Sequence, residues 1–145
     1  MVRIAYRVFP LDPAKSAMGE RSLWLPVIPI RLINGTCVVR VEGIVDSGSH
    51  FCLFHWRIGE LLGIDVGGGV RDTVLGALQA PHSEVFYHRL TMELAGERLN
   101  IIAAFSREVL QPCLLGREGF FDNFRVTFNP ESSPPGLELE RVCRT

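Results

Sequence analysis

Residues 41–49 read Val-Glu-Gly-Ile-Val-Asp-Ser-Gly-Ser, an apolar strand that runs into one carboxylate and then into three small residues. A lone aspartate in a loop is usually a turn former or a solvated charge. Asp46 differs because a second apolar run, residues 51–54, follows it directly. We therefore expect its carboxylate to be buried, where it needs hydrogen bonds or a partner charge to stay ionised. The small residues after it leave room for backbone N–H groups and for a partner.

The bulk properties describe one folded domain. A chain of 145 residues with 47% hydrophobic residues is long and apolar enough to bury a core, so disorder is excluded. A net charge of −1 gives no electrostatic case for nucleic acid or for an anionic membrane as partner. Charged residues interrupt every apolar run near the N-terminus, and no run approaches the ~18–20 residues that span a bilayer. We expect a soluble, cytoplasmic protein.

The cysteines and histidines give no metal signature. Four cysteines lie far apart with no C-x-x-C pair, which is typical of reduced thiols in a cytosolic protein. His50, Cys52 and His55 are close in sequence, but a structural zinc site needs four ligands and no second cluster supplies the rest. His88 lies on an apolar strand face and is expected to be a packed histidine. We predict no metal and no cofactor.

Short alternating runs predict an all-β fold. The expected strands are residues 2–8, 25–33, 36–45, 51–54, 70–75, 85–94, 99–105, 113–116, 124–128 and 137–142. Asn34-Gly35 predicts a type I′ hairpin turn, in which both residues take a positive φ. Helical spacing appears over residues 55–62, with Gly63 as its C-terminal cap, and a second short helix is expected over residues 117–123. This pattern is typical of a small antiparallel barrel or sandwich.

Two motifs resemble those of a known family. Asp46-Ser47-Gly48-Ser49, after the apolar residues 43–45, resembles the Asp-Thr/Ser-Gly-Ala/Ser signature of retropepsin-like (retroviral-type) aspartic proteases. Residues 114–117, Leu-Leu-Gly-Arg, resemble the second signature of that family, and residues 115–128 resemble the ending of its cellular members. The resemblance covers about residues 26–142. It implies a small closed antiparallel barrel over residues 25–143, preceded by an N-terminal strand and connector over residues 1–24.

The resemblance also implies an activity and a partner. In this family two aspartates share a proton and activate a water molecule that hydrolyses a peptide bond. The chain has one Asp-Ser-Gly and is too short for two lobes, and Asp72-Thr73 is followed by valine rather than glycine. An active enzyme would therefore be a homodimer that takes one Asp46 from each chain and acts on a peptide or protein substrate.

Site residues follow from the motif match, position by position. Asp46 would be the catalytic residue. Ser47, Gly48 and Ser49 would support the active-site loop, where the Ser47 hydroxyl locks the two loops together and Gly48 receives the substrate backbone. The residues expected to lie behind the loop are Leu115, Gly116 and Arg117. The residues expected to form the substrate-binding flap are Gly76, Ala77, Leu78, Gln79 and Ala80.

One position departs from the family pattern. His50 stands where viral members carry an acidic residue that pairs with the arginine of the second motif. Arg117 then needs another partner, such as Glu118 or Asp122. This departure keeps a second interpretation open: a retropepsin-like module without turnover, which dimerises or binds peptides. We also expect residues 2–8 and 137–142 to add strands to the barrel or to the dimer contact.

Overall fold

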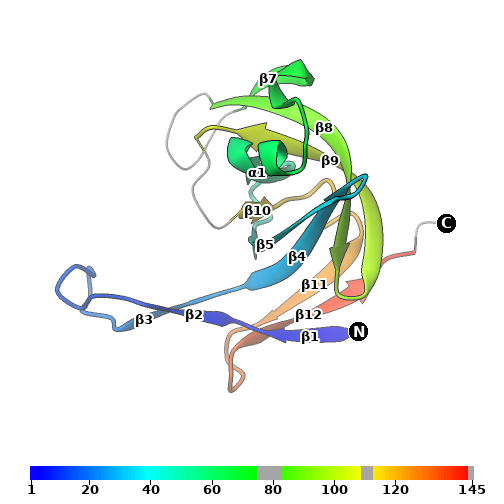
Figure 1. Cartoon of the computed structure of the whole chain (residues 1–145). Coiled ribbons are helices and arrows are strands. Elements are labelled where there is room, and N and C mark those ends of the chain that lie inside the picture. Colours follow the sequence, from blue (N-terminus) through cyan, green and yellow to red (C-terminus); the bar gives the residue numbers. More distant parts are fainter. Residues whose placement is uncertain (75–82, 109–112, 144–145) are drawn as a thin grey trace.

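The computed structural model describes residues 1–74, 83–108 and 113–143 (Figure 1). Strands dominate this part of the chain. In chain order the elements are β1 (Val2–Ala5), β2 (Arg7–Pro10), β3 (Ser22–Leu25), β4 (Val27–Asn34), β5 (Cys37–Val45), β6 (Cys52–His55), the helix α1 (Trp56–Leu61), the 3-10 turn η1 (Val66–Gly68), β7 (Val70–Val74), β8 (Ser83–Leu94), β9 (Glu97–Ser106), β10 (Cys113–Leu115), β11 (Phe124–Asn129) and β12 (Gly136–Arg141). The predicted all-β class is confirmed.

A closed barrel forms the body of the molecule. Its strands follow the order β4-β5-β10-β6-β9-β8, and a second pairing of β4, with β8, closes the ring. The closing register runs from Arg31 opposite Glu93 to Ile33 opposite Thr91. β7 extends the sheet beyond β8. The predicted closed barrel is therefore present, and the sandwich alternative is excluded.

The barrel is mixed rather than antiparallel, which corrects the expectation. β10 runs parallel to β5, with Cys113 opposite Gly43, and β6 runs parallel to β9, with Cys52 opposite Ala103. The alternation of side chains reports which face of a strand is buried but not which strand lies beside it, so the sequence could not reveal these pairings. As a consequence, β5 and β10 end at the same rim of the barrel.

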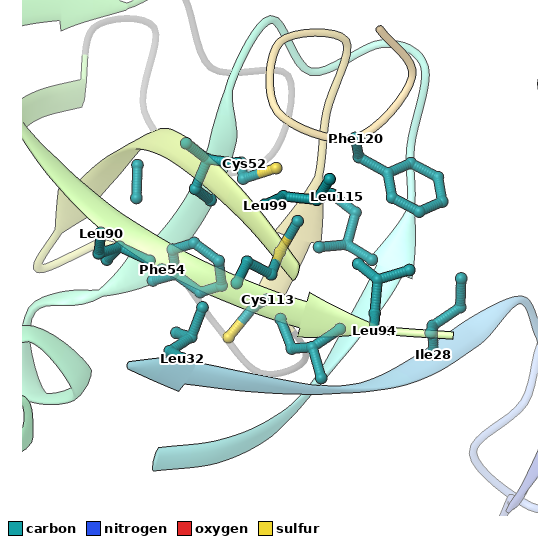
Figure 2. Close-up of a cluster of buried hydrophobic side chains, with 14 of the residues drawn as sticks. Ile28, Leu32, Cys52, Phe54, Leu90, Leu94, Leu99, Cys113, Leu115 and Phe120 are labelled. Atoms are coloured by element: carbon teal, nitrogen blue, oxygen red, sulfur yellow. The ribbon is translucent and has the colours of Figure 1, made fainter. Parts of the chain in front are cut away.

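Large apolar side chains from all the barrel strands fill its interior (Figure 2). Phe54, Phe105, Leu32 and Met92 are completely buried. Burial of a side chain of this size stabilises the fold by about 1.5–3 kcal/mol relative to exposure. Leu115, at the end of β10, belongs to the same core and ties the rim to the barrel interior.

The predicted turn at Asn34-Gly35 is shifted by one residue. Asn34 is the last residue of β4, paired with Cys37, and the turn is made by Gly35 and Thr36. Gly35 has the positive φ of 59° that a tight hairpin requires. The side-chain amide of Asn34 donates a hydrogen bond to the backbone carbonyl of Leu62 at 2.9 Å. This bond holds the barrel end against the segment after α1.

The predicted helix over residues 55–62 is confirmed as α1, whereas the one over residues 117–123 is wrong. His55 caps α1, because its side chain accepts a hydrogen bond from the N–H of Arg57. In residues 117–123 the N–H of Asp122 donates to the carbonyl of Arg117, a span of five residues rather than the four of an α-helix. Gly119, with a φ of 98°, turns the chain out of helical geometry.

Two smaller sheets complete the described structure. β12 lies between β1 and β11 in a three-stranded sheet. The strand expected over residues 2–8 is interrupted at Tyr6, and its second half, β2, pairs only with β3 in a two-stranded hairpin. Figure 1 shows this hairpin projecting away from the barrel. Among the described helices, none has the length and apolar character needed to cross a membrane.

Candidate active site

The Asp46 loop is fixed by backbone hydrogen bonds at the rim of the barrel. The N–H of Asp46 donates to the carbonyl of Leu115 at 3.0 Å, which joins the loop to the end of β10. Its side-chain Oδ1 accepts the N–H of Gly48 at 2.9 Å, and its carbonyl accepts the N–H of Ser49 at 3.2 Å. A short polar side chain that bonds its own backbone two residues on stabilises a tight turn. The carboxylate is therefore held in one orientation.

The loop faces outward. Asp46 is half-buried rather than buried as expected, and Ser47 and Gly48 are exposed. The apolar runs on either side do pack into the barrel, but the small side chains of the loop cover little of the carboxylate. Among the described residues the Ser47 hydroxyl has no hydrogen-bond partner. The single chain thus presents a carboxylate and a hydroxyl side by side at its surface.

The second motif passes directly behind this loop. A Cβ atom on Gly116 would lie 2.2 Å from the carbonyl oxygen of Phe51 and 2.7 Å from that of Ser49. Only glycine permits this approach of two backbones. The N–H groups of Arg117 and Glu118 then donate to the carbonyls of Ser49 and His50, at 2.9 and 2.7 Å. The structure therefore brings the two predicted motifs into contact.

Leu115 completes the packing on the inner side of the rim. A Cβ atom on Gly43 would lie 2.7 Å from Cγ of Leu115, so this glycine makes room for the leucine. Leu115 itself is fully buried. The pair explains why an apolar strand with one glycine precedes Asp46: the glycine lets β10 lie close beside β5.

Arg117 lies beside His50, at the edge of the loop. Nη2 of Arg117 is 3.5 Å from Nδ1 of His50, and Nε2 of His50 is 3.5 Å from a carboxylate oxygen of Glu118. Within the described part of the chain Arg117 forms no ion pair. Asp122, the other expected partner, accepts hydrogen bonds from Gly119 and Asn123. Glu118 therefore pairs with the histidine rather than with the arginine.

Two further residues, Tyr87 and Asp72, are connected to the loop through Phe51, and the sequence did not indicate either as a site residue. The ring of Tyr87, on β8, contacts the ring of Phe51, with centroids 4.7 Å apart. Its hydroxyl donates to Oδ2 of Asp72, on β7, at 2.9 Å. Burial, and then this bond to a carboxylate, raise the pKa of Tyr87 to about 12. In the β7–β8 register, Val70 lies opposite Tyr87, so the tyrosine is a diagonal neighbour of Asp72. The sequence does not reveal this register, and so it could not predict the contact.

The expected flap residues Gly76, Ala77, Leu78, Gln79 and Ala80 lie outside the described residues. The strands on either side of them, β7 and β8, are described. They pair as an antiparallel hairpin from Val70 opposite Tyr87 to Val74 opposite Ser83. This hairpin carries Tyr87 and Asp72, and so its base contacts the Asp46 loop through Phe51.

The histidines and cysteines near the loop are engaged in separate contacts. Sγ of Cys52 donates to the carbonyl of Glu118 at 3.6 Å, while the ring of His55 caps α1. In residues 1–74, 83–108 and 113–143, no three His, Cys, Asp or Glu side chains are grouped as metal ligands would be. His88 packs as expected, with Nε2 2.7 Å from the carbonyl of Val66.

Comparison with known proteins gives a structural likeness only. No family model matches the chain, and no curated protein matches it. Among solved structures, the chain is similar to EIAV protease in complex with the inhibitor HBY-793, with a TM-score of 0.47 and 14% sequence identity. The match covers 64% of this chain and 82% of that chain. A likeness at this level assigns no function.

Proposed function

We propose that this chain is an aspartic endopeptidase, active in the cytoplasm as a homodimer in which each chain supplies one Asp46. The observation that carries the proposal is the contact between the two motifs. Gly116 packs against backbone carbonyls of the Asp46 loop and its exit, and the N–H of Gly48 holds the half-buried carboxylate in one orientation. A half-buried carboxylate that a rigid rim presents outward is suited to meet an identical group across a two-fold axis.

Two such carboxylates carry out general acid–base hydrolysis. Like charges this close cannot both ionise, so the pair shares one proton. The ionised Asp46 takes a proton from water, whose oxygen attacks the peptide carbonyl carbon while the protonated Asp46 gives its proton to the carbonyl oxygen. When the tetrahedral intermediate collapses, the C–N bond breaks, the leaving nitrogen takes a proton from one Asp46, and the other Asp46 takes a hydroxyl proton of the intermediate, which restores the shared proton of the pair. No covalent bond forms between the enzyme and the substrate.

The rest of the loop supports this assignment. In a two-fold dimer the exposed Ser47 hydroxyl would bond across the axis to the partner loop. The backbone at Gly48, which carries no side chain, would receive the substrate. Leu115 and Gly116 would fix the position of the loop by packing against its inner side, and Arg117 would contact the edge of the loop at His50.

Substitution of the carboxylate tests the proposal. Asp46→Asn keeps the size of the side chain and removes its ability to hold and release a proton. We expect cleavage of a peptide library between pH 4 and pH 7 to fall at least about 1,000-fold. Asp65→Asn is the matched control, because Asp65 is exposed and its side chain makes no capping bond. Unchanged cleavage by the Asp46 variant would refute an aspartic mechanism.

A second candidate is a module that dimerises or binds peptides without turnover. The observation that favours it is His50, which gives Arg117 a histidine neighbour instead of a carboxylate. A purified wild-type chain that cleaves no peptide and binds no pepstatin-type inhibitor would support this candidate. His50→Asp supplies the missing anion beside Arg117, and cleavage that appears only in this variant would support it further.

A further inference from the structure

Within the described residues, the β2–β3 hairpin pairs with no strand of the barrel. Its strands pair from Arg7 opposite Leu25 to Pro10 opposite Ser22, and neither pairs with another described strand. An isolated two-stranded hairpin is only marginally stable in water. The hairpin nevertheless projects well away from the barrel (Figure 1). It therefore needs a surface to pack on.

Both faces of this hairpin carry apolar side chains, and three of these side chains are exposed. Residues opposite each other on paired strands point to the same face, so Val8 and Trp24 share one face while Phe9 and Leu23 share the other. The exposed fractions are 42% for Val8, 43% for Leu23 and 44% for Trp24. Clustered apolar side chains of this kind mark interaction surfaces.

The root of the hairpin adjoins the candidate active site. The N–H of Val45, the residue before Asp46, donates to the carbonyl of Pro26, the residue after β3. Arg7, the first residue of β2, forms an ion pair with Glu42 on β5. The hairpin therefore leaves the barrel beside the end of β5 that leads into the Asp46 loop, as Figure 1 shows.

We propose that the β2–β3 hairpin is an arm that packs against the second copy of this chain. The inference rests on the proposed function, which places the two-fold axis between the two Asp46 carboxylates. An arm rooted beside Asp46 then begins close to that axis. Its four-residue strands extend it by about 13 Å, and the residues between them extend it further. It points away from its own barrel, so its apolar side chains are accessible to a second copy (Figure 1).

Area and charge favour a second copy over other partners. A stable interface buries about 1,200–2,000 Å² in total, more than two small loops can supply. In a two-fold dimer each arm contributes, so the apolar area is counted twice. Residues 7–25 contain three basic and two acidic residues, a balance that provides no binding site for nucleic acid or an anionic membrane.

Substitutions in the arm test the inference by sedimentation. The double variant Leu23→Ser, Trp24→Ser removes one exposed apolar side chain from each face without touching the barrel core. We expect the dissociation constant of the dimer to rise at least tenfold. The matched control is Val38→Ser, Leu61→Ser, which removes two side chains of similar or greater exposure at the other end of the barrel. The control should leave the dissociation constant unchanged.

Fluorescence gives a second readout in a chain with an intact arm. The chain has two tryptophans, so Trp56→Phe leaves Trp24 as the sole tryptophan, and tryptophan emission then reports on the arm alone. Its emission should shift to shorter wavelength on dimerisation, with the same midpoint concentration as in sedimentation. If the arm variant leaves the dissociation constant of the dimer unchanged and the Trp24 emission stays constant on dimerisation, the arm proposal is wrong. The proposed function is not affected by that result.

The reverse outcome separates the two proposals. A dimer that depends on the arm but cleaves no peptide, with or without Asp46→Asn, would support the arm and refute the endopeptidase. A chain that stays monomeric at every concentration tested, or whose arm packs on an unrelated protein, would overturn the arm proposal.

Discussion

At the residue scale, the site depends on two backbones that touch at Gly116. The carbonyls of Phe51 and Ser49 occupy the space that any side chain at this position would need. Both belong to the Asp46 loop or its exit, so a change at Gly116 alters the position of the candidate catalytic carboxylate as well as the stability of the fold. The sequence predicted this crossing only through the motif match, because nothing in a lone Leu-Leu-Gly says what lies behind it.

Gly116→Ala tests that contact. The added methyl group overlaps backbone atoms that cannot rotate away, so we expect the free energy of unfolding to fall by about 2–4 kcal/mol. Urea unfolding measures the change. Gly67→Ala is the control, because its Cβ would lie 3.6 Å from the Trp56 ring, an ordinary contact, and should cost less than ~0.5 kcal/mol. Equal losses in the two variants would contradict the crossing.

At the element scale, the strands were predictable and their neighbours were not. The alternation of side chains found nearly every strand, but the parallel pairing of β10 with β5 joins segments far apart in sequence. For the same reason, the sequence did not predict the hydrogen bond between Tyr87 and Asp72. The half-burial of Asp46 was missed for another reason: its apolar flanks enter the barrel, while the loop between them stays on the rim.

Thiol labelling tests the placement of β6 and β10. Burial raises the pKa of Cys52 to about 12 and that of Cys113 to about 11, so both stay protonated and unreactive near neutral pH. We expect a thiol reagent at pH 8 to label the exposed Cys143 and to leave these two unmodified in the native protein, as read by mass spectrometry. In urea all three should react alike. Native labelling of Cys52 as fast as Cys143 would contradict the structure.

The raised pKa values of Cys52 and Cys113 determine how the free energy of unfolding changes with pH. A thiol whose pKa is raised by folding stays protonated in the native state, whereas in the unfolded chain it ionises near pH 8.5. The stabilising contribution of both cysteines is therefore complete below about pH 8.5. It is lost as the pH rises toward 11 and 12, and the free energy of unfolding should fall over that window.

At the scale of the whole molecule, a single chain holds only half of the proposed site. Asp46 is half-buried and Ser47 is exposed at the rim, and the β2–β3 hairpin, which begins beside this rim, pairs with no other strand in the described part of the chain. The proposed two-fold dimer would account for all three features, because it would supply the second carboxylate, a bonding partner for the hydroxyl and a surface for the hairpin. His50 and Arg117 lie together at the edge of the Asp46 loop.

If two Asp46 side chains form one site, their carboxylates must lie within hydrogen-bond distance of each other. A crystal structure of the purified chain would give that distance. We predict a two-fold dimer with the two carboxylates about 3 Å apart, close enough to share a proton. A monomer, or a dimer that keeps the two Asp46 carboxylates far apart, would rule out a shared aspartate site.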